Sequence, residues 1–170
     1  MAKELETEDL VLKRGDIKDA GKMHENFFKE KESAKYMLWQ PTQTVKDAET
    51  KIQKWKKYRD FLYFAYLKET DEPIGFVCIN QNRTNPLIFD EIGICVGSKF
   101  KRNGYAKQML KAVLDLCKTL GAEKFEYTCM KGNVASQKLA ESFGFELVKQ
   151  KRKNKLNGEQ YIEMIYEQNV

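Results

Sequence analysis

The chain has little of what several common enzyme mechanisms require. It contains one histidine, His24, in 170 residues, so a serine or cysteine triad could draw only on that residue as its base. The four cysteines, at positions 78, 95, 117 and 129, form none of the close pairs that bind zinc. Each lies among apolar neighbours, as a buried free thiol does. We therefore expect no metal site, no triad chemistry and a reducing, cytoplasmic environment.

Long apolar runs are also missing. The longest, Phe61 to Leu67, has seven residues, whereas a transmembrane helix needs roughly 18. The first nine residues are polar and acidic, unlike a secretory signal. Repeats, low-complexity stretches and linkers rich in proline or glycine are absent, and the chain has only three prolines. We expect no association with a membrane and a single domain over residues 1–170.

The composition is that of a folded, mildly basic protein. Lys and Arg number 30 against 25 Asp and Glu, which gives a formal net charge of +5. Hydrophobic residues make up 42% and charged residues 32%, a balance that argues against disorder. A domain of this length buries roughly two-thirds of its unfolded surface and needs no disulfide or metal to fold.

The hydrophobic periodicity predicts an α+β fold with a single mixed, mostly antiparallel sheet flanked by helices. Strands are predicted at 10–13, 61–69, 74–80, 88–96, 123–130, 145–153 and 160–168. Helices are predicted from Asp16 to Phe28, from Thr44 to about Trp55, at 104–120 and at 134–143, with an aromatic-rich connection at 36–41. The isolated Gly93 predicts a bulge or a close backbone approach. Asn157-Gly158 predicts a two-residue hairpin turn.

One turn, Lys101-Arg102-Asn103-Gly104-Tyr105-Ala106, joins the strand at 88–96 to the helix at 104–120. The start of a helix offers unpaired N–H groups and about half a positive charge, which together favour an anion such as phosphate. Gly104 would allow a phosphate close to the backbone, and Lys101 and Arg102 add charge. An ordinary turn with solvated lysines remains the alternative. No Gly-Lys-Ser/Thr follows, and the turn has one glycine, so it is neither a P-loop nor a dinucleotide fingerprint.

With a second block, this turn resembles the GNAT superfamily of acetyl-CoA-dependent N-acetyltransferases. Residues 101–106 match the family's pyrophosphate-binding pattern Arg/Gln-x-x-Gly-x-Gly/Ala, with Lys101 at its first position. Residues 133–136, Asn-Val-Ala-Ser, begin a stretch that ends in Gly144-Phe145, like the family's Asn-x-x-Ser/Ala helix closed by Gly-Phe. Residues 90–94, 38–41 and 133–136 together are similar to the branch that acetylates the N-terminal amine of ribosomal proteins, and to its small-molecule relatives.

The resemblance implies acetyl-CoA as co-substrate, no metal, and a set of residues that bind the CoA. These are Ile94, Cys95, Val96, Lys101, Arg102, Asn103, Gly104, Tyr105, Ala106, Asn133 and Ser136. In the family, a main-chain N–H of the strand at 88–96 stabilises the oxyanion, and such a donor can be worth about 3 kcal/mol. A covalent acetyl-cysteine at Cys95 is disfavoured, because the residue has no histidine partner and an inert buried thiol explains it.

The resemblance also implies direct attack of an amine on the thioester. Only a neutral amine attacks, and at pH 7 about one lysine amine in a thousand and about one α-amine in ten is neutral. A base therefore helps; the resemblance indicates Glu91, and a plain surface carboxylate is the alternative. Many relatives protonate the departing thiolate with a tyrosine where this chain has Ala140. Ser136 either takes that role or only hydrogen-bonds the pantetheine arm.

The acceptor is less well determined than the donor. Tyr36, Trp39 and Glu91 are the expected acceptor-side residues, and the acceptor is either a protein N-terminus, ribosomal proteins included, or a small amine. The oligomeric state stays open, a homodimer included.

Two other classes of function compete with the transferase. A basic segment, Lys149, Lys151, Arg152, Lys153 and Lys155, favours a nucleic-acid or ribosome-binding module. However, no aromatic residues interleave these charges, so a solvated face is the simpler interpretation and nucleic-acid binding is not expected. Because Ala140 replaces the tyrosine of many relatives, a CoA-binding protein without catalysis is the other alternative.

Overall fold

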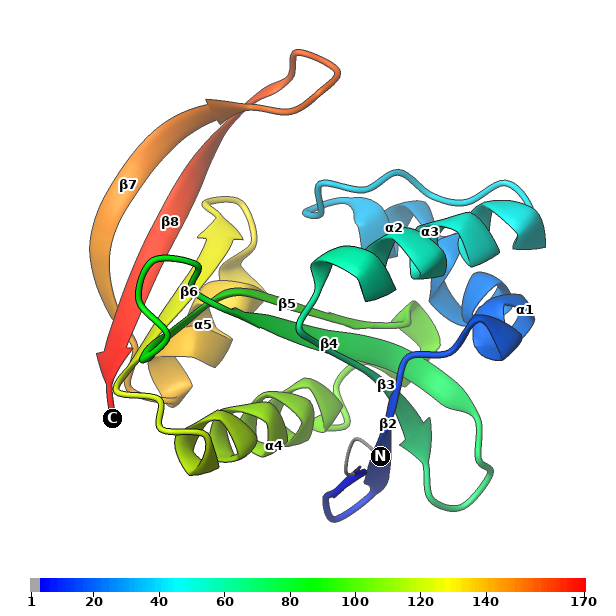
Figure 1. Cartoon of the computed structure of the whole chain (residues 1–170). Helices are drawn as coiled ribbons and strands as arrows, with labels where there is room; N and C mark the ends of the chain where they lie inside the picture. Colours follow the sequence, from blue (N-terminus) through cyan, green and yellow to red (C-terminus); the bar gives the residue numbers. More distant parts are fainter. Residues whose placement is uncertain (1–3) are drawn as a thin grey trace.

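An eight-stranded sheet forms the centre of the molecule in the computed structural model, which describes residues 4–170 (Figure 1). The strand order is β1-β2-β3-β4-β5-β6-β8-β7, and every neighbouring pair is antiparallel except β5 and β6. The bounds are β1 Leu5–Glu6, β2 Leu10–Arg14, β3 Phe61–Leu67, β4 Pro73–Gln81, β5 Ile88–Val96, β6 Lys124–Met130, β7 Glu146–Asn154 and β8 Gln160–Asn169. The predicted α+β class and mostly antiparallel sheet are confirmed.

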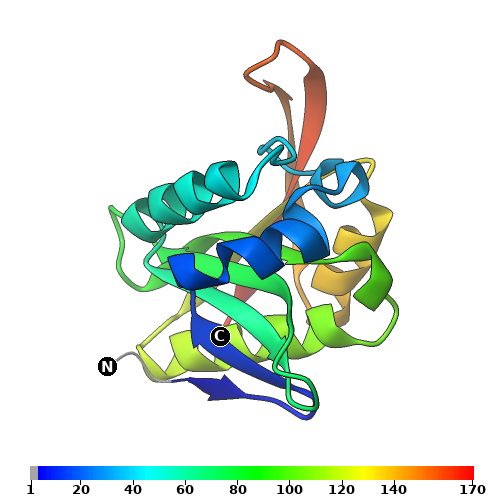
Figure 2. The same cartoon turned by 90° about the vertical axis from the view of Figure 1, so that its right-hand side faces the viewer.

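The helices cover both faces of the sheet (Figures 1 and 2). Their bounds are α1 Ala20–Met23, α2 Lys31–Ala34, α3 Val45–Tyr58, α4 Tyr105–Thr119 and α5 Val134–Ser142. Helices α4 and α5 pack on one face over a core that includes Met109, Val113 and Ala140. Helices α1 and α3 pack on the other over Met23, Ile52 and their neighbours. Among residues 4–170, no helix has both the length and the apolar character needed to cross a bilayer.

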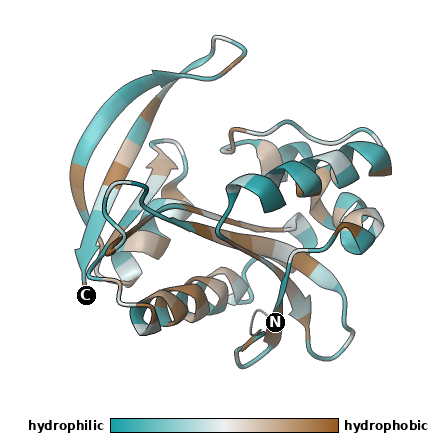
Figure 3. Ribbon diagram, viewed as in Figure 1, coloured by the Kyte–Doolittle hydropathy of each residue, from teal (hydrophilic) through white to brown (hydrophobic). Residues whose placement is uncertain are grey.

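The hydrophobic residues are concentrated in the central strands and in α4, where the sheet and the helices pack together (Figure 3). The apolar residues of α4 recur at helical spacing and are buried from Met109 to Cys117, which fixes the face that α4 turns to the sheet. Helix α3 begins at a capping box, in which the Thr44 side chain accepts the Asp47 N–H and the Asp47 carboxylate accepts the Thr44 N–H. This reciprocal pair satisfies two N–H groups that the helix start would otherwise leave unpaired.

The first predicted helix is not continuous, so this expectation was wrong in detail. A 3₁₀ turn at Ile17–Asp19 precedes α1, and a π-helical turn at His24–Phe28 follows it. The Asp16 side chain accepts the Lys18 N–H at 3.1 Å, as a cap does. The wider π turn allows the adjacent Phe27 and Phe28 to be fully buried together, which a regular helix surface rarely allows.

Strands β5 and β6 pair only at their beginnings. Their register contains two positions, Ile88 opposite Lys124 and Phe89 opposite Phe125, and beyond these the strands diverge (Figure 1). Just past this point, the register between β4 and β5 shifts, so that Glu91 and Ile92 both lie opposite the single residue Ile79. After Phe89, β5 therefore has no partner among residues 4–170 on the β6 side and a bulge on the β4 side, which distinguishes this part of β5 from the rest of the sheet.

Gly93 lies next to the bulge, and its close neighbour is a side chain instead of a backbone. A Cβ at this position would lie 2.8 Å from the Cys78 Sγ on β4, closer than real Cβ contacts. The bulge itself begins two residues earlier, at Glu91, whose φ of 51° lies in the left-handed region. For a residue with a Cβ this conformation costs about 1–2 kcal/mol, so the surrounding structure must hold it in place.

The turn end of the C-terminal hairpin of β7 and β8 extends beyond the rest of the sheet, whereas the other end of β8 pairs with β6 (Figure 1). Its predicted two-residue turn was wrong: the Lys155 N–H donates to the Glu159 O, and the Gly158 N–H donates to the Lys155 O. Three residues lie between Lys155 and Glu159, and Gly158, with a φ of 84°, supplies the left-handed residue that such a loop needs.

All nine residues of the edge strand β7 are exposed. Lys153 and Lys155 are paired with Glu163 and Glu159. Within residues 4–170, no ion pair involves the other three basic side chains of the segment, those at 149, 151 and 152. Lysines on an edge strand discourage pairing with another sheet, so this charge has a structural explanation.

Candidate active site

The free side of β5 presents main-chain N–H groups where β6 diverges. The Gly97 N–H donates to the Ile74 O at 2.8 Å. Cys95, two residues before Gly97, lies opposite Phe76 on β4. In an antiparallel pair, alternate residues direct their N–H and C=O groups to the same neighbour. The N–H groups of Ile94 and Val96 therefore point away from β4, toward the side where β6 no longer pairs. This is the location expected for the oxyanion donor.

The Cys95 side chain points the other way, into the core beneath α1 and α3. It is 7% exposed, and burial raises the pKa of this thiol to about 12. Its Sγ lies 3.7 Å from the Ser33 O. A protonated, enclosed thiol is a poor nucleophile, so the contribution of Cys95 to a site would be through its backbone.

The N-terminus of α4 follows β5 through a short 3₁₀ turn at Ser98–Phe100. Arg102 and Gly104 have φ values of 67° and 77°, and Asn103 Nδ2 stabilises the turn by donating to the Phe100 O at 3.0 Å. Within residues 4–170, no hydrogen bond occupies the backbone N–H groups of residues 102–106. Five consecutive unpaired donors at the positive end of a 15-residue helix form a site suited to an anion.

The three basic side chains of this turn differ in their partners. Lys99 is tied to Glu72, with its Nζ 3.1 Å from Oε1. Lys101 and Arg102 are exposed and take part in no ion pair with any residue from 4 to 170. A Cβ at Gly104 would have nothing within 4 Å, so close packing does not require a glycine here. The glycine allows the positive φ and leaves the N–H groups open to a ligand.

Ser136 and Asn133 lie at the start of α5, as the motif predicted. Asn133 Oδ1 accepts the Ser136 N–H at 3.2 Å, which is an N-cap interaction. The Ser136 Oγ lies 2.7 Å from the hydroxyl of Tyr127 on β6. Tyr127 is 1% exposed, and burial raises its pKa to about 12, so the phenol stays protonated and can donate to Ser136.

Sequence reasoning missed Tyr127. The alternation of β6 places Tyr127 and Cys129 on one face of the strand, and the helix that begins at Asn133 returns over that face. That pattern could have indicated the pairing with Ser136. Ala140, where many relatives carry a tyrosine, is fully buried in the core.

Glu91 is held by two donors from different elements. Asn80 Nδ2, on β4, donates to the Glu91 Oε2 at 2.6 Å, and Arg59 Nη1, just beyond α3, donates to the same oxygen at 2.9 Å. The Glu91 side chain is still 63% exposed. It is therefore fixed in orientation and open to solvent, a combination that suits a base and also fits an ordinary surface ion pair.

The two predicted acceptor-side aromatics have different surroundings. The Tyr36 ring lies against Gly132, where a Cβ would be 3.2 Å from it, so Tyr36 connects the segment after α2 to the turn between β6 and α5. Trp39 packs edge-on to Phe28 with 5.7 Å between ring centroids. The Lys51 Nζ lies 4.6 Å from the centroid of the Trp39 ring, and burial lowers the pKa of Lys51 to about 8.

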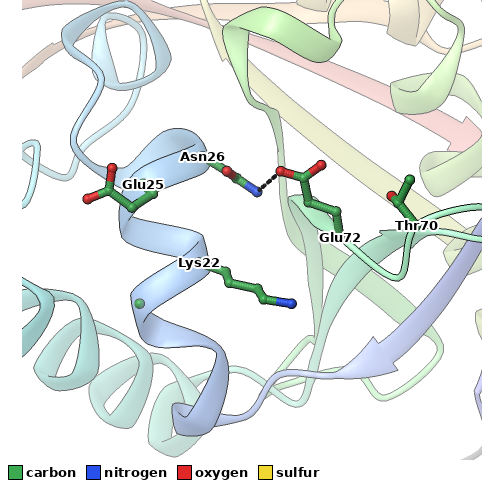
Figure 4. A pocket seen from close by; sticks show the side chains of 6 residues that line it. Lys22, Glu25, Asn26, Thr70 and Glu72 are labelled. Atoms are coloured by element: carbon green, nitrogen blue, oxygen red, sulfur yellow. Dashed lines mark hydrogen bonds between the residues drawn. The ribbon is translucent and has the colours of Figure 1, made fainter.

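A hollow elsewhere on the surface has no part in this arrangement (Figure 4). It has a volume of about 380 Å³ and lies between α1 and the turn that joins β3 to β4. Asn26 Nδ2 donates to both the Glu72 Oε1 and the Pro73 O. None of the site residues predicted from the sequence lines it, so we do not assign it to catalysis.

Comparison with known families agrees with this geometry. The model of the "Acetyltransferase (GNAT) domain" matches residues 9–146, and the chain belongs to this family.

Individual relatives are distant. Over 95 residues the chain is 27% identical to the L-amino acid N-acetyltransferase AaaT of Escherichia coli (strain K12). The matched region covers 55% of this chain and 59% of that protein, less than two thirds of the length of the curated relative.

Solved structures share the fold over the whole chain. A GNAT-family acetyltransferase from Bacillus anthracis has a TM-score of 0.86 at 19% identity, covering 98% of both chains. RimL, a ribosomal L7/L12 alpha-N-protein acetyltransferase solved in complex with coenzyme A, has a TM-score of 0.85 at 19% identity, covering 99% of this chain and 98% of that one. At these identities the similarity shows the fold, and the acceptor has to be argued separately.

Proposed function

We propose that residues 1–170 form a single cytoplasmic domain that transfers the acetyl group of acetyl-CoA to an α-amine by direct attack. The acceptor is either a protein N-terminus or a small amine such as a free amino acid. The observation that carries the proposal is the presence, within residues 4–170, of two neighbouring sets of unpaired N–H groups, one at Ile94 and Val96 on β5 and one at residues 102–106 before α4. All four cysteines are free thiols, which supports the reducing compartment.

The residues present fit acetyl-CoA. The unpaired N–H groups at the start of α4, with Lys101 and Arg102 beside them, are the donors that a pyrophosphate requires. The outward N–H groups of β5 suit the amides of a pantetheine arm. Asn133 and Ser136, at the start of α5, would hold the same arm from the β6 side. When bound, acetyl-CoA supplies an activated thioester carbonyl.

Three tasks then fall to the chain's own side chains and amides. Glu91 takes the proton that the amine loses as it attacks. A β5 N–H stabilises the negative charge that develops on the carbonyl oxygen. Ser136, with its hydroxyl held by the buried Tyr127, donates a proton toward the departing sulfur. Tyr36 and Trp39, from the segment between α2 and α3, shape the acceptor side.

Two lines of support favour an α-amine over a lysine side chain. The relative from Escherichia coli is named for free amino acids, and RimL is named for the α-amine of a protein; both acceptors are α-amines. The chemistry agrees, because an α-amine is neutral about a hundred times more often than a lysine amine at pH 7. One exposed carboxylate can then suffice as the base.

The expected result is acetylation at the α-amine alone. The protein is incubated with acetyl-CoA and two matched peptides, one with a free N-terminus and no lysine, the other with a blocked N-terminus and one lysine, together with free amino acids. Mass spectrometry should find acetyl groups on free α-amines and at most a trace on the lysine peptide. Preferential acetylation of the lysine peptide would contradict the proposed acceptor class.

A further inference from the structure

Asn80 links the end of α3 to the bulge in β5. Asn80 is 5% exposed, and both the oxygen and the nitrogen of its side-chain amide form hydrogen bonds. Asn80 Oδ1 accepts the Asp60 N–H at 3.0 Å, and Nδ2 donates to the Tyr58 O at 3.4 Å and to the Glu91 Oε2 at 2.6 Å. A buried amide with this many partners has a single orientation. It therefore fixes the carboxylate to which it donates.

Arg59 acts on the same carboxylate from the other side. Its Nη1 donates to the Glu91 Oε2 at 2.9 Å and lies 3.5 Å from the Glu91 main-chain O. Arg59 immediately follows α3, and its own N–H donates to the Trp55 O. This hydrogen bond fixes the backbone that carries the guanidinium. One group thus contacts both the side chain and the backbone of the bulged residue.

Both donors converge on one oxygen of Glu91. Oε2 accepts from Asn80 and Arg59, whereas no donor among residues 4–170 is hydrogen-bonded to Oε1. The left-handed backbone at Glu91, with a φ of 51°, brings the carboxylate to these donors. An exposed glutamate would otherwise populate several rotamers, and ordering it has an entropic cost. The hydrogen bonds from Asn80 and Arg59 order the Glu91 side chain when the protein folds, so this cost does not fall on the reaction. They leave Oε1 able to accept a proton.

We propose that Asn80 and Arg59 are positioning residues for acetyl transfer, holding Oε2 of Glu91 so that Oε1 accepts the proton of the attacking amine. The inference rests on the proposed function. As the nitrogen forms its bond to the thioester carbonyl carbon and the carbon–sulfur bond breaks, the surplus proton of the amine passes to Oε1. The electron pair of the broken bond leaves with the sulfur as thiolate. Neither positioning residue gains or loses a proton.

The test is a set of double-mutant cycles with Glu91→Gln. Asn80→Ala and Arg59→Met are each made in the wild-type chain and in the Glu91→Gln chain, and Arg59→Lys serves as the conservative variant. Arg83→Met is the matched control. Arg83 lies in the loop between β4 and β5, and its Nη2 pairs with the Oδ1 of Asp60, the residue next to Arg59, at 3.1 Å without contacting Glu91. Acetyl transfer to an α-amine is measured as kcat and KM, with thermal unfolding to confirm that each variant is folded.

In the wild-type chain, Asn80→Ala and Arg59→Met should each lower kcat by about tenfold or more, the scale on which misplaced catalytic groups act. KM for acetyl-CoA should stay within about twofold, and Arg59→Lys should recover part of the loss. In the Glu91→Gln chain the same changes should cost less than about twofold, because groups that act through one residue are not additive. Arg83→Met should leave kcat unchanged. The Asn80→Ala penalty should also shrink with less basic acceptor amines.

Two outcomes are distinguishable failures. If the wild type transfers acetyl but the Asn80→Ala and Arg59→Met penalties persist undiminished in the Glu91→Gln chain, the two residues act structurally and the inference is overturned alone. If the wild-type chain transfers acetyl to no amine, the proposed function fails and this inference fails with it.

Discussion

Replacing Glu91 with glutamine is expected to lower kcat about 100-fold with an α-amine acceptor, at the low end of what a positioned base contributes. Glutamine keeps the size of the side chain and can still accept the hydrogen bonds of Asn80 and Arg59. What is removed is the negative charge of the carboxylate, and with it the ability to take a proton. Steady-state kinetics over a range of acceptor concentrations measures the loss, and the dissociation constant of acetyl-CoA should not change.

The control for Glu91→Gln is Glu123→Gln, the same chemical change at an exposed position just before β6. It should leave kcat within about twofold, as surface substitutions usually do. The base assignment also predicts that the Glu91→Gln penalty grows as the acceptor amine becomes more basic, because less of that amine is already neutral. A Glu91→Gln enzyme with full kcat on every acceptor would show that Glu91 is only a surface carboxylate.

Replacing Gly104 with alanine is expected to weaken acetyl-CoA binding about tenfold. Gly104 has a φ of 77°, a region that alanine avoids at a cost of about 1–2 kcal/mol. Relaxing that strain turns the N–H groups of residues 102–106 out of line. A hydrogen bond to a charged group is worth about 1.5–3 kcal/mol, so losing one accounts for a factor of ten or more. Titration calorimetry with acetyl-CoA measures the change.

Gly121→Ala provides the matched control for this effect. Gly121 lies just beyond the other end of α4 and has a φ of 88° with nothing within 4 Å of a Cβ, as at Gly104. Both variants should lose similar free energy of unfolding, and only Gly104→Ala should lose acetyl-CoA affinity. Equal affinities in the two variants would place the CoA pyrophosphate away from the start of α4.

The sequence predicted the fold well where local signals and packing agree. The strands that follow α3 begin and end within two residues of their predicted limits, and α4 and α5 within one. Alternation over 88–96 and the stripe from Met109 to Cys117 are strong because each has one buried face. The short β1 at Leu5–Glu6 went unpredicted, since two residues carry no periodicity.

Where the prediction failed, tertiary packing decided the outcome. Residues 16–28 have a helical stripe, but burying Phe27 and Phe28 together requires a π turn. At Asn157-Gly158 the turn signal was correct, but the loop closes at Lys155 and Glu159 instead. A local signal can identify such an element without determining its hydrogen-bond register.

In the candidate site, too, local signals were predictable from the sequence and contacts between distant elements were not. Motif spacing led to Gly104, Asn133 and Ser136, because those residues lie within single strand–helix junctions. The partners of Glu91 could not be predicted this way, since Arg59 and Asn80 are 32 and 11 residues away in the chain. They meet Glu91 only after α3, β4 and the bulge of β5 are assembled.

The most direct test of the account is thermal unfolding of the protein with acetyl-CoA, CoA and ATP in parallel. A ligand at 100 times its dissociation constant adds about 2.7 kcal/mol to the free energy of unfolding, which raises the midpoint of a domain of this size by several degrees. Acetyl-CoA and CoA should each produce such a rise, and ATP should produce none. No rise with acetyl-CoA at any concentration would contradict the proposed function.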